Sequence, residues 1–345
     1  MKSLSVRINY ALVISIIVFS YFSSCKKTED PVKFPVGTFP DSTIILSDLN
    51  SPYDDFEITN IDLVIDETDT EIHELFGAIP LIITTNRIST GEQSDLTGGI
   101  LTFSWDQTSG DFELTADIGG DPFLTNLMQA ANTAGDDPGA YRRFSSLDGY
   151  EYLIVSSENG TGDLDFNYFK NIPVTGTGLP AILGPYPVLL LNSGADDIYL
   201  CFDTNMDSAY FSSAIEGNFD IYLKSRPAQT DLTTWFDNSY SQSNKVDSIN
   251  STSDEKCPLV YRNVLVFASD RPGGFGGYDL YYSLFKNGKW NSPVNFGPDI
   301  NTSFNEYRPV IGTHADFDNH FLIFSSDRPE GKGLFDLYFR GVNIP

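Results

Sequence analysis

The chain is predicted to be an all-β protein, a β-propeller of five blades with four antiparallel strands each. Aromatic residues make up 14% of its 345 residues, and its 28 Gly and 19 Pro suit many short strands joined by tight turns. A unit consisting of an apolar strand, a Gly-rich turn and an Asp-x-Tyr motif recurs, most clearly at 264–283 and 321–340 and more loosely at 80–106, 152–170 and 209–224. Because one small sheet cannot bury both of its faces, five such units predict a closed ring of blades.

Each repeat begins with an Asn that is followed, after three residues, by an acidic pair. The innermost strand is expected directly after this pair, the second strand is the apolar run, and the third carries Asp-x-Tyr. A fourth, outer strand is expected in the segment around Trp290 and Pro293. The repeats are longer than the usual blade of about 40–50 residues, which predicts long loops at 119–149 and 226–249. The blades are expected to start near Asn50, Asn132, Asn192, Asn250 and Asn301.

The last repeat has no outer strand of its own, since the chain reaches Pro345 directly after the third strand. Residues 43–46, Thr-Ile-Ile-Leu, read as a strand and hold the place before the first repeat that 290–300 holds before the fifth. We therefore expect 43–46 to pair with the sheet that ends at 335–340. This pairing would close a propeller that spans 36–345.

The N-terminal residues have the features of a bacterial export signal. Basic residues precede an uncharged run at 8–24, which is short for a membrane span and typical of a signal peptide. The run ends in Phe-Ser-Ser-Cys, which resembles a lipobox. It predicts a signal peptide at 1–24, lipidation of Cys25 and a polar tether at 25–35, with an ordinary secretory signal as the alternative. We expect a protein anchored to the outer membrane, and its facing toward the periplasm or the cell surface stays open.

The charge of the chain limits its partners. It has 47 acidic and 21 basic residues, for a formal net charge of −26. A polyanion repels nucleic acid and anionic lipid head groups. We therefore predict no nucleic-acid partner, and contact with the membrane through the lipid anchor only.

A family resemblance follows from the full pattern at 250–297. This stretch reads Asn-x-x-x-Asp-Glu, then Phe-x-Ser-Asp-Arg-Pro-x-Gly-x-Gly-x-x-Asp-Leu-Tyr, then Trp-x-x-Pro-x-x-x-Gly. It resembles the TolB-type, WD-repeat-like propeller repeats of lipoproteins from Gram-negative bacteria of the Bacteroidetes type. Repeats four and five match well, whereas repeats two and three lack the Arg and have Asn159 and Ile215 near that place. The resemblance implies a propeller of the cell envelope.

The acidic pairs are the most regular chemical feature of the repeats. A five-fold ring would place them at equivalent points near one mouth of the channel, where clustered carboxylates would suit a cation or a basic peptide. The alternative is a structural role, with the carboxylates accepting hydrogen bonds from turn amides and from Arg87, Arg271 and Arg328. The candidate ring consists of Asp54, Asp55, Asp136, Asp137, Asp196, Asp197, Asp254, Glu255 and Glu306.

Other motifs give little support for a cofactor. The segment 203–207, Asp-Thr-Asn-Met-Asp, opens like a calcium loop but lacks the following Gly and the bidentate Glu, so calcium is only a weak expectation. The three histidines lack metal-binding spacing, and no metal site or other cofactor is predicted. Cys201 and Cys257 either form a disulfide or remain buried thiols, since sequence does not give their separation.

The chain also lacks the Gly-x-Ser-x-Gly elbow of a serine hydrolase. We therefore predict that the protein is not an enzyme, but a lipoprotein whose propeller binds or scaffolds a protein or another envelope component. The alternative is a carbohydrate-active or other hydrolytic propeller with a site at the mouth of the central channel. Glycoside hydrolysis needs two well-placed carboxylates, and a chain with 47 acidic residues can supply them. The identity of the partner and the oligomeric state stay open.

Overall fold

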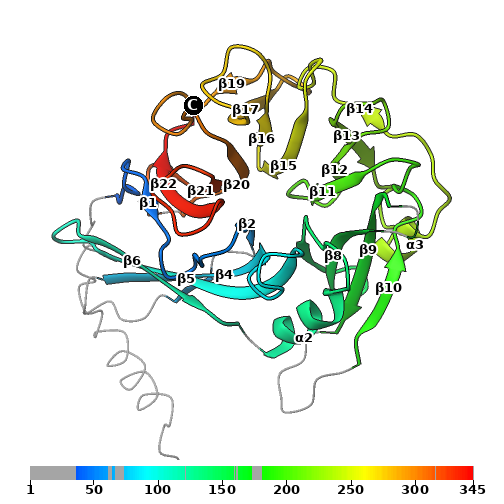
Figure 1. The fold of residues 1–345 in the computed structure, drawn as a ribbon, viewed down its shortest axis with the longest axis horizontal. Helices are drawn as coiled ribbons and strands as arrows, with labels where there is room; N and C mark the ends of the chain where they lie inside the picture. Colours follow the sequence, from blue (N-terminus) through cyan, green and yellow to red (C-terminus); the bar gives the residue numbers. More distant parts are fainter. Residues whose placement is uncertain are drawn as a thin grey trace, which may run out of the picture. The chain divides into compact units, whose positions relative to one another are not determined.

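The computed structural model arranges five antiparallel sheets around a central axis, in the unit that begins at Val36 (Figure 1). The predicted five-bladed propeller is confirmed. The predicted signal peptide, Cys25 and the tether lie outside the described residues, so the lipid anchor and the location at the outer membrane stay predictions. No helix in the described part of the chain is long and apolar enough to cross a membrane. The structure describes residues 36–60, 64–66, 74–120, 122–158, 160, 162–172, 181–314 and 316–344.

In every blade the innermost strand comes first among the consecutive strands, and the following strands are added outward. Blade one contains β2 (Asp55–Asn60), β4 (Glu74–Thr85), β5 (Asp95–Asp106) and β6 (Phe112–Ile118), with β3 (Val64–Asp66) paired to β4. Blade two contains β7 (Tyr141–Ser145), β8 (Tyr150–Glu158), β9 (Leu164–Asn171) and β10 (Leu183–Pro187). Blade three contains β11 (Asp197–Phe202), β12 (Ser208–Ser213), β13 (Asp220–Ser225) and β14 (Asn244–Lys245). Blade four contains β15 (Glu255–Tyr261), β16 (Val264–Ser269), β17 (Asp279–Lys286), β18 (Lys289–Trp290) and β19 (Val294–Asn295). Blade five contains β20 (Glu306–Gly312), β21 (His320–Ser326), β22 (Asp336–Val342) and β1 (Ile44–Ile45).

The second strand of a blade is packed on both faces, which explains its continuous apolar sequence. β16 reads Val-Leu-Val-Phe-Ala-Ser and is buried at all six residues. One face of it contributes Val264 and Val266 to a core shared with Leu322 and Phe324 of blade five. The other face contributes Leu265 and Phe267 to a core shared with blade three. β-branched and aromatic residues suit such a strand.

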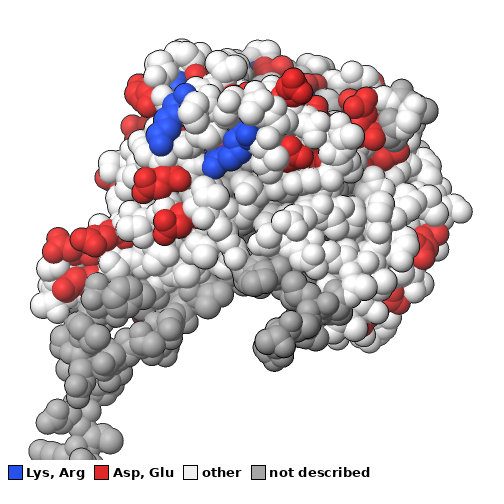
Figure 2. All heavy atoms as spheres, turned by 60° about the horizontal axis from the view of Figure 1, so that its bottom comes forward, with Lys and Arg blue, Asp and Glu red and all other residues white. Residues whose placement is uncertain are grey.

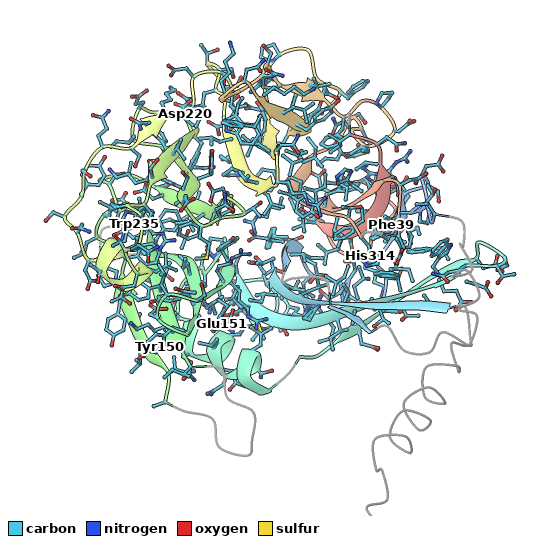
Figure 3. All side chains as sticks on the ribbon, turned by 180° about the vertical axis from the view of Figure 1, so that it is seen from behind. Phe39, Tyr150, Glu151, Asp220, Trp235 and His314 are labelled. Atoms are coloured by element: carbon cyan, nitrogen blue, oxygen red, sulfur yellow. The ribbon has the colours of Figure 1, made fainter. Side chains whose placement is uncertain are left out.

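The N-terminal strand closes the ring on blade five, as predicted. Ile44 and Ile45 pair antiparallel with Phe339 and Tyr338 of β22. Just before β1, the Phe39 N–H donates to Asn319 Oδ1 at 2.8 Å, and Asn319 Nδ2 donates to the Phe39 carbonyl at 2.9 Å. The ring of Phe39 is fully buried between blades five and one (Figure 3). Residues on either side of the ring closure are thus held by backbone pairing and by a shared core.

The two predicted long loops each contain a helix, which composition alone did not indicate. α2 (Pro122–Ala131) buries Leu127 and Met128 against residues of blades one and two. α3 (Leu232–Phe236) begins after Asp231, whose side chain accepts the N–H of Thr234 at 2.9 Å. Both segments are rich in Asp, Asn, Ser, Thr and Gly, which favour turns. The buried apolar residues of the two helices pack against the blades.

The negative charge is spread over the surface. Figure 2 shows acidic side chains scattered over the visible face, with a group at the projecting end of the β5–β6 hairpin at the left. Lys and Arg side chains are few on this face. This distribution is that of a solvated acidic surface.

Candidate functional site

The second acid of each repeated pair lies buried in the turn before or at the start of its own innermost strand. In all five blades one carboxylate oxygen accepts the backbone N–H of the residue four positions earlier. In three blades an Arg adds an ion pair, which links Arg87 to Asp55, Arg271 to Glu255 at 2.9 Å and Arg328 to Glu306 at 2.9 Å. The five acids, each with 0% of its surface exposed, are Asp55, Asp137, Asp197, Glu255 and Glu306.

The first member of each pair contacts the preceding blade instead. Its side-chain oxygen accepts backbone N–H groups of that blade, as Asp254 Oδ1 does from Phe219 at 3.0 Å. The other members of this set are Asp54, Asp136, Asp196 and Asn305, which accept from Phe335, Ser94, Leu164 and Tyr278. These contacts fasten one blade to the next, so the structure places the acids of the candidate ring in turns and blade contacts.

The Asn that opens each repeat makes a second contact of this kind. Asn301 Oδ1 accepts the N–H of Leu280 at 2.8 Å, and its Nδ2 donates to the carbonyl of the same residue at 2.9 Å. This pair of hydrogen bonds satisfies one backbone residue of the third strand in the preceding blade. The other four Asn residues repeat it on Leu337, Leu96, Phe166 and Ile221.

A different position lies two residues after each buried acid, and in four of the five blades its residue lines the central cavity. A β-bulge or irregularity falls at or next to this position in β2, β11, β15 and β20. The backbone at four of the five positions has a positive φ, between 48° and 73°. We call the five residues the channel ring; they are Glu57, Gly139, Tyr199, Cys257 and Arg308.

The backbone of the channel ring repeats, but its side chains do not. One blade supplies an acid, one a phenol, one a thiol and one a guanidinium, while Gly139 supplies no side chain. A Cβ at Gly139 would lie 3.1 Å from the nitrogen of Tyr199, so glycine leaves room for its neighbour. Structural roles recur in every blade of a repeat protein. Four of these residues, Glu57, Tyr199, Cys257 and Arg308, also line one cavity, and this convergence makes the channel ring the candidate functional site.

Glu57 and Arg308 are the charged pair of the ring. Glu57 Oε2 accepts hydrogen bonds from the Gly139 N–H at 2.9 Å, from Thr84 Oγ1 at 3.2 Å and from Arg308 Nη1 at 3.2 Å. Arg308 Nη2 donates to the Tyr199 hydroxyl at 2.7 Å. Among the described residues every hydrogen bond to this carboxyl goes to Oε2.

Burial determines the protonation state of the titratable side chains in the channel ring. Desolvation raises the pKa of Glu57, and the guanidinium of Arg308 opposes part of that rise. Burial also raises the pKa of Tyr199 and raises that of Cys257 to about 12. The phenol and the thiol are therefore neutral at physiological pH. Cys257 is not an activated nucleophile, because the reactive form of cysteine is the thiolate.

A cavity of about 40 Å³ runs from the ring along the channel, past Thr59, Cys201 and Val310. This space suits a few water molecules, since one water needs roughly 10–15 Å³ of such volume. Cys201 and Cys257, for which a disulfide stayed open, are both free and buried. The structure finds no group of three or more His, Cys, Asp or Glu side chains suited to a metal in the part of the chain that it describes.

Sequence reasoning did not single out Glu57 or Arg308. The signal was present, because aligning the repeats on the buried acid puts Glu, Gly, Tyr, Cys and Arg at one offset. Within the strands these residues read as ordinary members of a repeat. Only their convergence on one axis distinguishes them.

Comparisons with known proteins were made for the sequence and for the structure. No protein-family model matches the chain, and no curated protein matches it. Among solved structures, an endo-arabinase from Bacteroides thetaiotaomicron aligns with 91% of this chain and 99% of its own, at 12% identity and a TM-score of 0.45. An exo-β-1,3-galactanase from Phanerochaete chrysosporium aligns over 88% and 64%, at 12% identity and 0.47. A thermostable family-43 glycoside hydrolase aligns over 86% and 93%, at 11% identity and 0.43.

These comparisons correct several expectations from the sequence. The expected kinship with TolB-type and WD-repeat-like lipoproteins is wrong, because the similar solved structures are named as a family-43 glycoside hydrolase, an endo-arabinase and an exo-β-1,3-galactanase. The same finding corrects the expectation of a non-enzymatic scaffold that binds a protein or envelope partner. At these identities and TM-scores the function of this chain has to be argued from its own residues.

Proposed function

We propose that this protein is a carbohydrate-active hydrolytic propeller whose reacting site is the channel ring, with Glu57 as its acid. One observation carries the proposal. At a repeat position whose side chain differs from blade to blade, a carboxyl with a raised pKa lies beside an Arg at the wall of a cavity. Groups with perturbed pKa values in a cavity are the usual candidates for acid–base chemistry.

The raised pKa suits proton donation. Glycosidic bonds break when a carboxylic acid protonates the leaving oxygen. In the proposed step, Glu57 gives its proton to that oxygen as the bond to the anomeric carbon breaks, and the electron pair of the bond stays with the oxygen. Water adds to the anomeric carbon and loses a proton to solvent, and Glu57 regains a proton from solvent.

The surroundings of Glu57 suit a polyhydroxylated substrate. Arg308, Thr84 and the Gly139 N–H donate to the carboxyl, and the guanidinium lies over the Tyr199 ring, 4.8 Å from its centroid. The cavity of about 40 Å³ is narrower than a sugar ring. The sugar is therefore proposed to bind at the mouth of the channel. The cavity would hold the water that adds to the anomeric carbon.

Glu57 is the single carboxyl among the described residues that line this cavity. Most glycoside hydrolases use a pair, so the test has to separate binding from turnover. The unmodified protein is incubated with a panel of aryl glycosides and plant and bacterial polysaccharides. Reducing ends report turnover, and isothermal titration reports binding.

The informative variant is Glu57→Gln, which keeps the shape of the side chain and removes its proton. We expect kcat to fall by about 10²–10⁴-fold, the usual contribution of a general acid, with sugar binding retained. The matched control is Glu113→Gln, on an exposed residue of β6. Full activity of Glu57→Gln would overturn the assignment of the acid. If the protein neither turns over nor binds any member of the panel, the proposed function is overturned.

A further inference from the structure

Blade three contains a second, smaller cavity, whose lining includes none of the channel-ring residues. It measures about 10 Å³, and its lining includes Asp197, Ile215, Tyr222 and Ser243. We call it the blade-three cavity. Three buried oxygens from these residues make no hydrogen bond to any described residue, namely Asp197 Oδ1, Tyr222 OH and Ser243 Oγ. Buried polar atoms are usually paired, so three together at one cavity require an explanation.

The other blades show what normally fills this place. In blade four, Glu255 Oε1 accepts from Arg271 Nη2 at 2.9 Å, Ser269 Oγ at 2.8 Å and Ser251 Oγ at 2.6 Å. Blade five repeats all three contacts on Glu306 Oε1. In blade three Ser193 and Ser213 interact with the carboxyl of Asp197, but neither hydroxyl lies at hydrogen-bonding geometry to its Oδ1. The guanidinium that supplies the positive charge in blades four and five has no counterpart here, because its position is taken by an isoleucine.

Blade two also lacks the Arg but compensates for it. Asp137 Oδ1 accepts from Ser157 Oγ at 2.6 Å and from Thr133 Oγ1 at 3.2 Å. Blade one keeps its own pair between Arg87 and Asp55. Blade three is therefore the one blade in the described structure whose buried acid has an oxygen without a partner.

The nearest lysine does not supply the missing charge. Lys245 lies opposite Tyr222 in the sheet, but its Nζ contacts Asp220 Oδ2 at 2.6 Å and Glu216 Oε2 at 3.1 Å. Figure 3 labels Asp220 on blade three. The carboxyl of Asp197 is fully buried and has no cation beside it among the described residues, and a buried carboxylate needs a counter-charge.

We propose that the blade-three cavity binds one monovalent metal cation, preferably Na⁺, in the place that the guanidinium of arginine takes in blades four and five. About 10 Å³ holds a single atom-sized guest and excludes an organic amine. The three partnerless oxygens are a carboxylate, a phenol and an aliphatic hydroxyl, which are hard ligands that suit such a cation. One carboxylate neutralises one positive charge, so a divalent ion would be left undercompensated.

The test compares thermal unfolding of the protein at pH 8 in NaCl, KCl and choline chloride at one ionic strength. Choline is too large for the cavity and serves as the inert salt. We expect Na⁺ to raise Tm above its value in choline by about 2 °C at a tenfold excess over Kd, with saturation. Equal Tm values in Na⁺ and choline would overturn the proposal in favour of a water molecule. A larger effect of CaCl₂ than of NaCl would overturn the monovalent assignment.

The decisive variant is Ile215→Arg, which restores the arginine of the other repeats. Because the arginine replaces an isoleucine that lines the cavity, its guanidinium has room to reach Asp197. It should abolish the response to Na⁺ and give a Tm in choline at least as high as that of the parent. The control is Ile88→Arg, which adds the same charge at a residue that is 54% exposed and should keep the full Na⁺ response. Asp197→Asn should also lose the response. A Na⁺ effect that survives in both Ile215→Arg and Asp197→Asn would refute the site.

Discussion

Replacing Arg308 with methionine would leave the Glu57 carboxyl in the channel wall without its cation. The side chains are only 8% and 12% exposed, so this is a buried pair. Removing one partner of a buried pair costs about 3–5 kcal/mol, because the remaining charge is uncompensated. The substitution also removes the hydrogen bond that Arg308 Nη2 donates to the Tyr199 hydroxyl. We expect Arg308→Met to lower the free energy of unfolding by about 3–5 kcal/mol at pH 8.

The cost of this substitution should depend on pH. The pKa of Glu57 in the folded protein is raised above its unfolded value, so stability falls as pH rises through the folded pKa. Arg308 opposes that rise, and its loss moves the folded pKa higher and enlarges the fall in stability. At pH 5 more of the carboxyl is protonated, and the loss should be smaller than at pH 8.

The free energy of unfolding is measured by urea denaturation at pH 5 and pH 8. The four proteins compared are the parent, Arg308→Met, Glu57→Gln and the double variant. Because glutamine removes the charge that arginine compensates, the double variant should recover much of the loss. A penalty for Arg308→Met that is the same at pH 5 and pH 8, and that the second substitution does not reduce, would refute the buried-pair reasoning.

Three further changes test the fold around the site. Gly139→Ala should cost about 1–3 kcal/mol in urea denaturation, because φ is 73° there and the new Cβ would lie 3.1 Å from the Tyr199 nitrogen; unchanged stability would show that the turn relaxes freely. Asn301→Ala should lower stability by about 2–4 kcal/mol in thermal melts, since the buried N–H and carbonyl of Leu280 both lose their partner. Removal of 36–46 should abolish a single cooperative unfolding transition followed by circular dichroism, and a sharp transition at the parent Tm would contradict the closure described above.

The repeats predicted the fold better than they predicted the site. Blade number, strand order within a blade and the closing role of 43–46 all follow from strand-length motifs and their spacing, which are local signals. The partners of the repeated polar residues are not local. Asn50, for example, bonds Leu337 on the last blade, so the motif shows that a residue recurs but not what it contacts.

The channel ring shows the same limit more sharply. Glu57 and Arg308 are neighbours in space and 251 positions apart in sequence. Their importance lies in differing from their equivalents, whereas a search for repeats selects what is shared. The helices in 119–149 and 226–249 were missed for another reason, because turn-forming composition outweighed a few apolar residues that only tertiary packing makes helical. The assignment of function failed because it relied on the absence of motifs.

The closure through β1 and Phe39 affects how the chain acquires its structure. Synthesis delivers the N-terminal residues first, and their partners around 316–342 last. Until then β1 is an unpaired strand, and the inner face of blade one lacks the phenylalanines of blade five. The ring can close only after residues far apart in sequence have paired, which makes folding slow. Unpaired strand edges and apolar surface stay exposed during folding. A circular permutant that begins near 290 and joins residue 344 to Val36 through a linker would make that contact early, and should refold faster and with less aggregation.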